Sequence, residues 1–215
     1  DHLTEYAVEW FKMLKKKYGE GRERKTQLRS FESISRSAVA VANVKLYAQM
    51  EEGFVGHGLK RGEGELVCEC SDIDDIIVIR KDGVLQVSKV SQKAFFGKDI
   101  LHVGVWKRGD ERTVYNCIYL DGATGRSLVK RFNVPAITRD REYNITKGTP
   151  KSRLLYFTAN PNGEAEIVTV FLRNSARLKK LKFDLDFTEM SIRGRGAGGN
   201  LVSKNPIRKI EMTEE

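Results

Sequence analysis

Side chains that could carry out catalytic chemistry are few in this sequence and widely separated. The histidines and cysteines are His2, His57, His102, Cys68, Cys70 and Cys117, with no Cys-x-x-Cys spacing. A nucleophile needs a base within hydrogen-bond reach, and a structural zinc site needs four clustered ligands. We therefore expect no nucleophilic enzyme and no metal site, and we expect the cysteines to be buried free thiols in a reducing compartment.

The densest group of carboxylates is Asp72-Ile73-Asp74-Asp75. Paired acids can serve as general acid and base or as metal ligands, but neither a histidine nor a third ligand follows here. Aspartate side chains also cap turns by accepting hydrogen bonds from nearby backbone N–H groups. We expect turn capping at this position.

Positive charge is the chemical feature that stands out. The chain has 38 Lys and Arg against 29 Asp and Glu, a formal net charge of +9. A basic surface favours a polyanionic partner, because binding releases condensed counterions. A nucleic acid fits better than a membrane: no apolar run approaches the roughly 18 residues of a membrane span, and only the opening segment is amphipathic.

The segment 191–200, Ser-Ile-Arg-Gly-Arg-Gly-Ala-Gly-Gly-Asn, combines glycines with two arginines. Glycine exposes backbone N–H groups and permits close approach of a phosphate chain, while Arg193 and Arg195 supply charge. Neither a Gly-Lys-Ser/Thr motif nor a helix follows, so nucleotide-binding fingerprints do not match. A turn between strands and a phosphate cradle both remain open.

These residues must be positioned by β-structure that repeats along the chain. The clearest unit is Asp75–Val90, where two β-branched runs flank Lys81-Asp82-Gly83, a strong hairpin signal. We expect related units at 39–56, 115–137, 154–172 and 199–210. Anchor glycines at 53, 83, 125, 163 and 199 give spacings of 30, 42, 38 and 36 residues. This scale favours propeller-like blades, with an all-β sandwich as the alternative.

The start of the chain differs from the rest. Residues 4–18 have apolar side chains at i, i+3, i+4 and i+7, which predicts an amphipathic helix ended by Gly19. We expect this stripe to pack in a protein core, with a membrane surface as the alternative. A basic connector follows, so we predict one region at 1–36 and a β-domain at 37–215.

The repeated Gly-x-x-Val-x-Lys pattern, seen in Gly83-Val-Leu-Gln-Val-Ser-Lys89 and in 199–204, resembles the C-terminal domain of type IIA topoisomerase A subunits. Those are the A subunits of bacterial DNA gyrase and of topoisomerase IV. The opening helix with Gly-Arg-Glu-Arg-Lys-Thr at 21–26 is similar to the end of the breakage–reunion core of that family. The resemblance covers nearly the whole chain.

The resemblance implies a mainly β chain: a β-pinwheel of about four to five blades, with strands exchanged between neighbouring blades, preceded by an N-terminal α-helix. It implies that duplex DNA wraps around a basic outer rim without base reading. The wrapping motif Gln-Arg-Arg-Gly-Gly-Lys-Gly has only partial echoes here, at 93–99 and 193–199. That departure favours a topoisomerase IV-like subunit or a divergent gyrase.

The resemblance also implies partners that this chain does not contain. The parent enzyme would be an ATP-dependent type II topoisomerase of the bacterial cytoplasm and nucleoid, with a B subunit plus a second A subunit. We expect a fragment without the catalytic tyrosine and without a cofactor of its own, because ATP and Mg²⁺ would be bound by other domains. The opening at Asp1, without Met, agrees with a fragment.

We expect the DNA contacts to come from lysines and arginines of outer strands and loops. The candidates are Lys60, Arg61, Lys89, Lys93, Lys98, Lys130, Arg131, Arg139, Arg141, Lys147, Arg193, Arg195, Lys204, Arg208 and Lys209. Contacts of this kind position a duplex without reading its sequence, and their affinity falls steeply with salt. The alternative from another class is a protein-interaction propeller whose basic charge is incidental.

Overall fold

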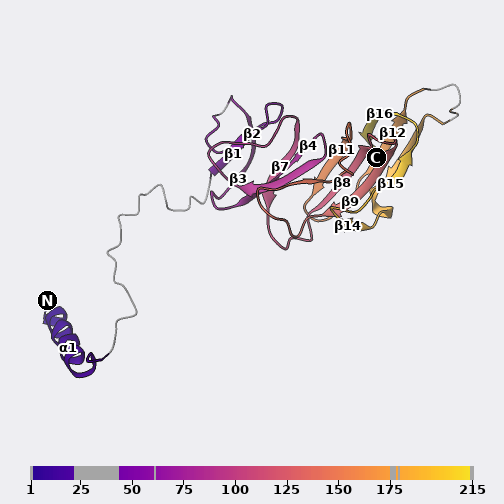
Figure 1. The fold of residues 1–215 in the computed structure, drawn as a ribbon. Helices are drawn as coiled ribbons and strands as arrows, with labels where there is room; N and C mark the ends of the chain where they lie inside the picture. The colour runs from indigo at the N-terminus through magenta and orange to yellow at the C-terminus, as the bar shows by residue number, and fades with distance from the viewer. Residues whose placement is uncertain (1, 22–43, 61, 175–177, 179, 214–215) are drawn as a thin grey trace. The chain divides into compact units, whose positions relative to one another are not determined.

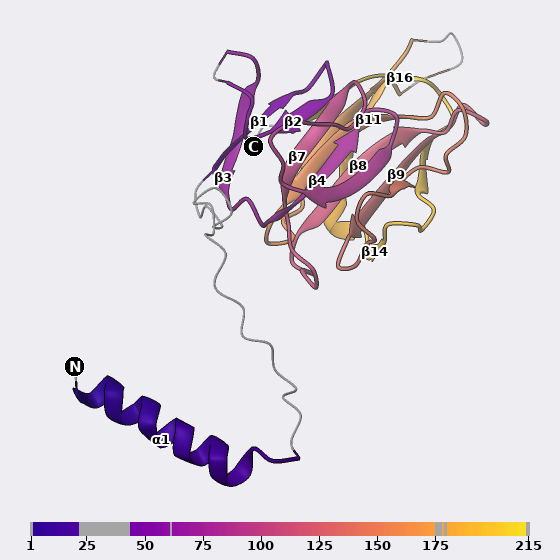
Figure 2. The same ribbon diagram turned by 60° about the vertical axis from the view of Figure 1, so that its left-hand side comes forward.

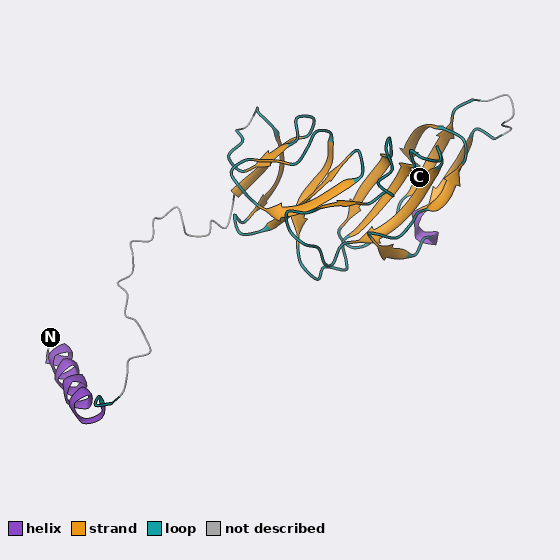
Figure 3. Ribbon diagram, in the orientation of Figure 1, coloured by secondary structure: helices purple, strands orange, loops and turns teal. Residues whose placement is uncertain are grey.

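The computed structural model describes residues 2–21, 44–60, 62–174, 178 and 180–213. The chain forms two compact units, Asp1–Val39 and Ala40–Glu215. The predicted boundary between residues 36 and 37 lies outside the described residues and remains a prediction. Strands dominate the described part and one α-helix opens it (Figure 3), which confirms the mainly β prediction.

The helix α1 extends over His2–Tyr18, slightly further at its start than predicted. Glu5 in its first turn and the lysines at 15–17 in its last turn have the charges that the helix dipole favours at each end. No residue of α1 is buried, and the apolar side chains of Trp10 and Phe11 are exposed. Within the described ranges, no helix has the length and apolar character needed to cross a membrane.

The first sheet of the second unit has the order β3-β1-β2-β6. Strands β1 (Val44–Gln49) and β2 (Phe54–Gly56) form an antiparallel hairpin. Strand β3 (Glu65–Cys70) pairs with β1. Strand β6 (Ala94–Phe95) arrives from further along the chain and pairs with β2.

The second sheet repeats this plan in the order β10-β5-β4-β7. Strands β4 (Asp75–Arg80) and β5 (Val84–Lys89) form the predicted hairpin. Strand β7 (Ile100–Trp106) pairs with β4, and β10 (Glu142–Asn144) pairs with β5. Gly83 has a φ of +84° in the turn, the left-handed conformation for which the Asp-Gly sequence is suited.

The third sheet is built on the hairpin of β8 (Val114–Leu120) and β9 (Ser127–Asn133). Strand β11 (Arg153–Asn160) pairs with β8. Two later strands pair with β9: β14 (Ile192–Gly194) runs parallel to it, and β15 (Asn200–Ser203) runs antiparallel.

The fourth sheet has three strands in the order β13-β12-β16. Strands β12 (Ile167–Leu172) and β13 (Lys182–Asp186) form its hairpin, and β16 (Ile207–Met212) pairs with β12. A short 3₁₀ helix, Phe187–Glu189, follows β13 and is capped by the Asp186 carboxylate.

Three of the four sheets therefore contain a strand that belongs, in sequence, to the following unit. We call β6, β10, β14 and β15 the incoming strands. Each lies on the outer edge of the second hairpin strand of its sheet, β2, β5 or β9. This arrangement confirms the predicted exchange of strands between neighbouring blades, and four sheets fall within the predicted number of blades.

Two of the predicted repeat units are not hairpins. The segments 154–172 and 199–210 each hold two strands, but β11 pairs with β8 and β12 pairs with β13, while β15 and β16 join different sheets. The turn at Gly163 reverses the chain without pairing its flanks. The apolar faces decide the pairing, because Leu154 and Val168 are buried in different core clusters.

Three apolar clusters form the core of the described part of the chain, and each is packed between two successive sheets. In β4, Ile76 and Val78 are buried in one cluster, whereas Ile77 and Ile79 are buried in the next. Because side chains alternate along a strand, β4 must be covered on both faces, which explains its unbroken apolar run. The sheets follow one another in chain order in Figures 1 and 2. Cys70 and Cys117 are buried free thiols, as predicted, and Cys68 is half-buried.

Candidate nucleic-acid interface

Exposed basic residues border the incoming strands of three successive sheets. Lys93 and Lys98 stand on either side of β6, and Arg139, Arg141 and Lys147 stand around β10. Arg193 lies in β14, and Lys204 follows β15. All seven side chains are exposed. The fold thus brings predicted contact residues from distant parts of the sequence to equivalent positions in neighbouring sheets.

The other exposed candidates do not border an incoming strand in sequence. Lys60 is in the turn between β2 and β3, and Lys89 ends β5. Arg208 and Lys209 are in β16, where Lys209 forms an ion pair with Glu211. Arg61 lies outside the described residues.

Lys130 is a predicted rim contact that the structure places in the interior, where its side chain is 5% exposed. Its ammonium group donates to the backbone carbonyl of Ile145 at 2.6 Å, to that of Ala197 at 3.1 Å and to that of Arg195. Burial lowers the pKa of this ammonium group. Because its three N–H donors already have carbonyl acceptors, Lys130 does not fit a phosphate contact.

Arg131 is also interior, with 9% exposure. Its guanidinium group donates to the backbone carbonyls of Gly163 and Glu164 in the turn between β11 and β12. In the sequence, nothing distinguishes Lys130-Arg131 from the other basic residues in or near predicted strands. The burial of both neighbours follows from apolar clusters on the two faces of β9, which contain Val129 and Phe132.

Arg141 and Arg195 are 54 positions apart in the sequence but meet at one aromatic ring. The guanidinium carbon of Arg195 lies 4.1 Å from the centroid of the Tyr143 ring, and that of Arg141 lies 5.4 Å from it. A hydrogen bond with Thr138, followed by the charges of both arginines, lowers the pKa of Tyr143. Cation–π stacking holds two positive charges together beside β10.

Arg139 has an acidic partner. Its guanidinium group forms an ion pair with the Asp75 carboxylate at 2.9 Å, on the margin of a shallow depression. Arg108 lines the same depression and was not among the predicted contacts. The charged turn around Arg108 was the available sequence signal, but nothing in the sequence places it beside Arg139.

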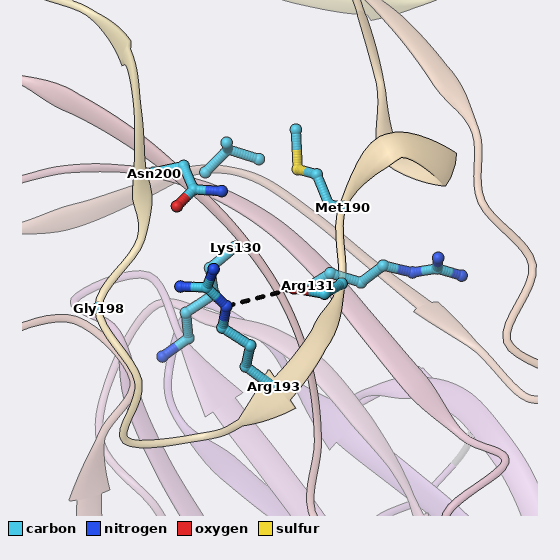
Figure 4. A pocket seen from close by; sticks show the side chains of 8 residues that line it. Lys130, Arg131, Met190, Arg193, Gly198 and Asn200 are labelled. Atoms are coloured by element: carbon cyan, nitrogen blue, oxygen red, sulfur yellow. Dashed lines mark hydrogen bonds between the residues drawn. The ribbon is translucent and has the colours of Figure 1, made fainter.

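The glycine-rich segment has the form of a turn rather than a preformed phosphate cradle. Its Arg195 and Ala197 carbonyls accept from Lys130, and the Gly199 N–H donates to the Tyr119 hydroxyl at 3.1 Å. Figure 4 shows a narrow recess beneath this segment, bordered by Lys130, Arg193 and Asn200. There Arg193 donates to the Ser191 hydroxyl at 3.3 Å, drawn as a dashed line.

Comparisons with known proteins agree on one type of domain. The family model described as "Topoisomerase C-terminal domain, Bacteroidota" matches residues 45–215. The A subunit of DNA topoisomerase 4 from Borreliella burgdorferi is 24% identical over 208 residues, which are 96% of this chain and 31% of that protein. A crystal structure of the C-terminal domain of DNA topoisomerase IV aligns with a TM-score of 0.54 and 12% identity, covering 81% of this chain and 63% of that one. The chain thus spans less than a third of the curated relative.

Proposed function

The chain belongs to the topoisomerase C-terminal domain family of Bacteroidota, and from this premise we propose that it binds and bends duplex DNA through the phosphate backbone. The observation that carries the proposal is the set of exposed cations beside the incoming strands of three successive sheets. Repetition of charge at equivalent positions suits a polymer with evenly spaced phosphates better than it suits a compact ligand.

The proposed contact is independent of DNA sequence. The cations are long, exposed side chains such as Lys93, Lys98, Arg141 and Lys147, which can reach phosphate oxygens. Bending a duplex of a few helical turns costs on the order of 1–6 kcal/mol, and additional phosphate contacts along a curved path offset that cost. Lys130 and Arg131 are excluded from the proposed contacts because they are buried.

We assign this domain to the A-type subunit of a type IIA topoisomerase, of the topoisomerase IV type or a divergent gyrase. There it would present a DNA segment for strand passage. A B subunit, together with a second A subunit, would complete the enzyme in the bacterial cytoplasm and nucleoid. Cleavage, ATP hydrolysis and Mg²⁺ binding would belong to other parts of that enzyme, and we assign no cofactor to this chain.

The test compares two triple charge reversals with equal changes in net charge. One variant carries Lys93→Glu beside β6, Arg141→Glu beside β10 and Arg193→Glu within β14. The matched control carries Lys45→Glu, Lys107→Glu and Lys180→Glu, three exposed positions outside the incoming strands and the strands that pair with them. Affinity for a duplex of random sequence is measured against salt concentration, and bending is measured by energy transfer between dyes at the two DNA ends.

The first variant should lose affinity by roughly 10- to 1,000-fold at low salt and should lower the salt slope by about 3, whereas the control should change both far less. Equal losses in the two variants would show that net charge, not the incoming strands, governs binding. A wild-type affinity that does not depend on salt would overturn the proposal itself.

A further inference from the structure

Among the described residues, the fourth sheet lacks an element that the other three have. The second hairpin strands β2, β5 and β9 each pair with an incoming strand on their outer edge. The equivalent strand of the fourth sheet is β13, and among the described residues no strand pairs with its outer edge. In this repeat plan, β13 is an acceptor strand that no described segment of the chain covers.

The register of β13 shows which backbone groups are available. The N–H of Leu172 donates to the Leu181 carbonyl, and the N–H of Phe187 donates to the Glu166 carbonyl. Because hydrogen-bonded pairs alternate in an antiparallel ladder, Phe183 and Leu185 direct their backbone groups toward β12. The N–H and C=O groups of Lys182 and Asp184 therefore point to the outer edge, as does the N–H of Asp186. The Asp186 carbonyl is the N-cap acceptor of the following 3₁₀ helix.

The incoming strands β6 and β10 show what such an edge accepts on its apolar side. Phe95 of β6 is directly opposite Phe54, with ring centroids 5.2 Å apart. Tyr143 of β10 is directly opposite the buried Leu85. These two incoming strands thus each set an aromatic ring against an apolar side chain of the acceptor strand, whereas β14 and β15 contain no aromatic residue. Phe183 and Leu185 are half-buried and offer the same kind of apolar surface on β13.

Charge is complementary in the second sheet. Glu142 of β10 forms an ion pair with Arg80 of β4 at 2.9 Å, so the charged side chain of this incoming strand meets an opposite charge within its sheet. On β13, Asp184 is exposed and Asp186 is half-buried, beside the single cation Lys182. An incoming segment should therefore place Lys or Arg opposite these aspartates, one position away from its aromatic residue.

We propose that the outer edge of β13 is a docking site for an extended segment of a partner protein in which basic and aromatic residues alternate. The segment adds to the fourth sheet as a strand antiparallel to β13, the direction in which β6, β10 and β15 join their hosts. Main-chain hydrogen bonds to Lys182, Asp184 and Asp186 hold it, and the alternating side chains select it. This docking site does not depend on DNA binding.

The test uses the 215-residue chain and a synthetic peptide of about six residues, capped at both ends, that alternates lysine with tyrosine. Binding is measured by fluorescence anisotropy, and hydrogen exchange of individual amides is followed by NMR. The amides of Lys182, Asp184 and Asp186 should exchange at least about tenfold more slowly with the peptide bound, whereas those of Phe183 and Leu185 should change little because β12 already protects them. A peptide with glutamate in place of lysine should bind at least about tenfold more weakly.

Three substitutions separate the edge from its surroundings. Asp184→Pro removes the outward N–H without removing a bond to β12, and should lower affinity at least about tenfold. Asp184→Asn keeps the N–H and should lose only a few-fold, about the effect of one exposed charge. Thr169→Val removes the hydroxyl that donates to the Asp184 carboxylate at 2.7 Å and should bind as the wild type does.

Other outcomes overturn the proposal. Peptide binding without added protection at Lys182, Asp184 and Asp186 would place the contact elsewhere on the protein. Slow exchange of these three amides without peptide would show that the edge is already covered. Slow exchange that does not change on dilution would indicate a segment of the same chain, and slow exchange that is lost on dilution would indicate a second copy. Thermal melting of Asp184→Pro shows whether its lost affinity reflects unfolding. The exchange pattern of the wild type shows whether the peptide docks on the outer edge of β13, independently of that variant.

Discussion

The ammonium group of Lys130 in β9 donates a hydrogen bond to the backbone carbonyl of Ile145 at 2.6 Å, just beyond the incoming strand β10. The same nitrogen donates to the carbonyls of Arg195 and Ala197, just beyond the incoming strand β14. One buried cation therefore fixes the ends of two incoming strands that belong to different sheets. This role is structural, although the residue is basic and lies in a basic protein.

Replacing Lys130 with methionine should destabilise the fold by about 2–4 kcal/mol, because one buried and two half-buried carbonyls lose a charged donor. Urea unfolding followed by circular dichroism measures this change. Lys204→Met, at an exposed position, should alter stability by less than about 0.5 kcal/mol. If the two variants are equally stable, the hydrogen bonds of Lys130 contribute nothing to the fold.

Gly199→Ala should be destabilising because the new Cβ would lie 2.9 Å from the Val129 carbonyl oxygen and 3.0 Å from the Leu128 Cβ. Overpacking of this kind typically costs about 1–3 kcal/mol. Gly196→Ala is the matched control in the same segment, since its Cβ would meet no atom within 4 Å. Thermal unfolding of both variants tests the difference, and equal melting temperatures would contradict close packing at Gly199.

The stability of the β-domain should fall between pH 6.5 and about pH 4 in a manner that depends on His102. This ring lies against Tyr115 and Phe157, and burial lowers the pKa of His102 to about 4. The unfolded chain binds a proton at its ordinary pKa near 6.5, so acidification through this window favours unfolding. The contribution of the buried, neutral His102 ring to stability is fully present above about pH 6.5.

The measurement compares the wild type with His102→Gln by urea unfolding at about pH 7 and about pH 4. The wild type should lose about 1–3 kcal/mol more than the variant over this range, because glutamine does not titrate. Acidic groups contribute equally to both proteins and cancel. Identical losses would show that His102 has the same pKa in the folded and the unfolded protein.

Cys117 should resist alkylation in the folded protein. Its side chain is fully buried between the second and third sheets, and burial raises the pKa of this thiol to about 12. Because the thiolate is the reactive form, modification requires opening of the β-domain. Mass spectrometry after iodoacetamide treatment should find Cys68 labelled before Cys117, and simultaneous labelling without denaturant would refute this order.

Much of the β-domain could be predicted because its signals are local. The Asp-Gly turn at residues 82–83 and the β-branched runs beside it are sufficient to define the hairpin of β4 and β5. The amphipathic pattern of 4–18 likewise predicted α1. The turn before Gly163 led to a wrong prediction that residues 154–172 form one unit, because a tight turn does not determine which strands pair across a sheet.

The candidate interface was only partly predictable. Sequence indicates that Lys93, Arg141 and Arg193 are basic and near strands, but their equivalence depends on strands donated between sheets. The same sequence signal marked Lys130, which is buried. Exposure is a property of the packed fold, so charge alone could not separate the two groups.

The mainly β character, the repeated β-units and the excess of positive charge are local properties of the sequence, since they follow from side-chain type and spacing within a few positions of the chain. Three other features come from the packed fold of the described residues: which cations are exposed, which strands change sheet, and the absence on β13 of the incoming strand that β2, β5 and β9 receive. Those facts depend on contacts between residues far apart in the chain. Burial and hydrogen-bond pairing select such contacts over the whole domain, and no local pattern encodes them.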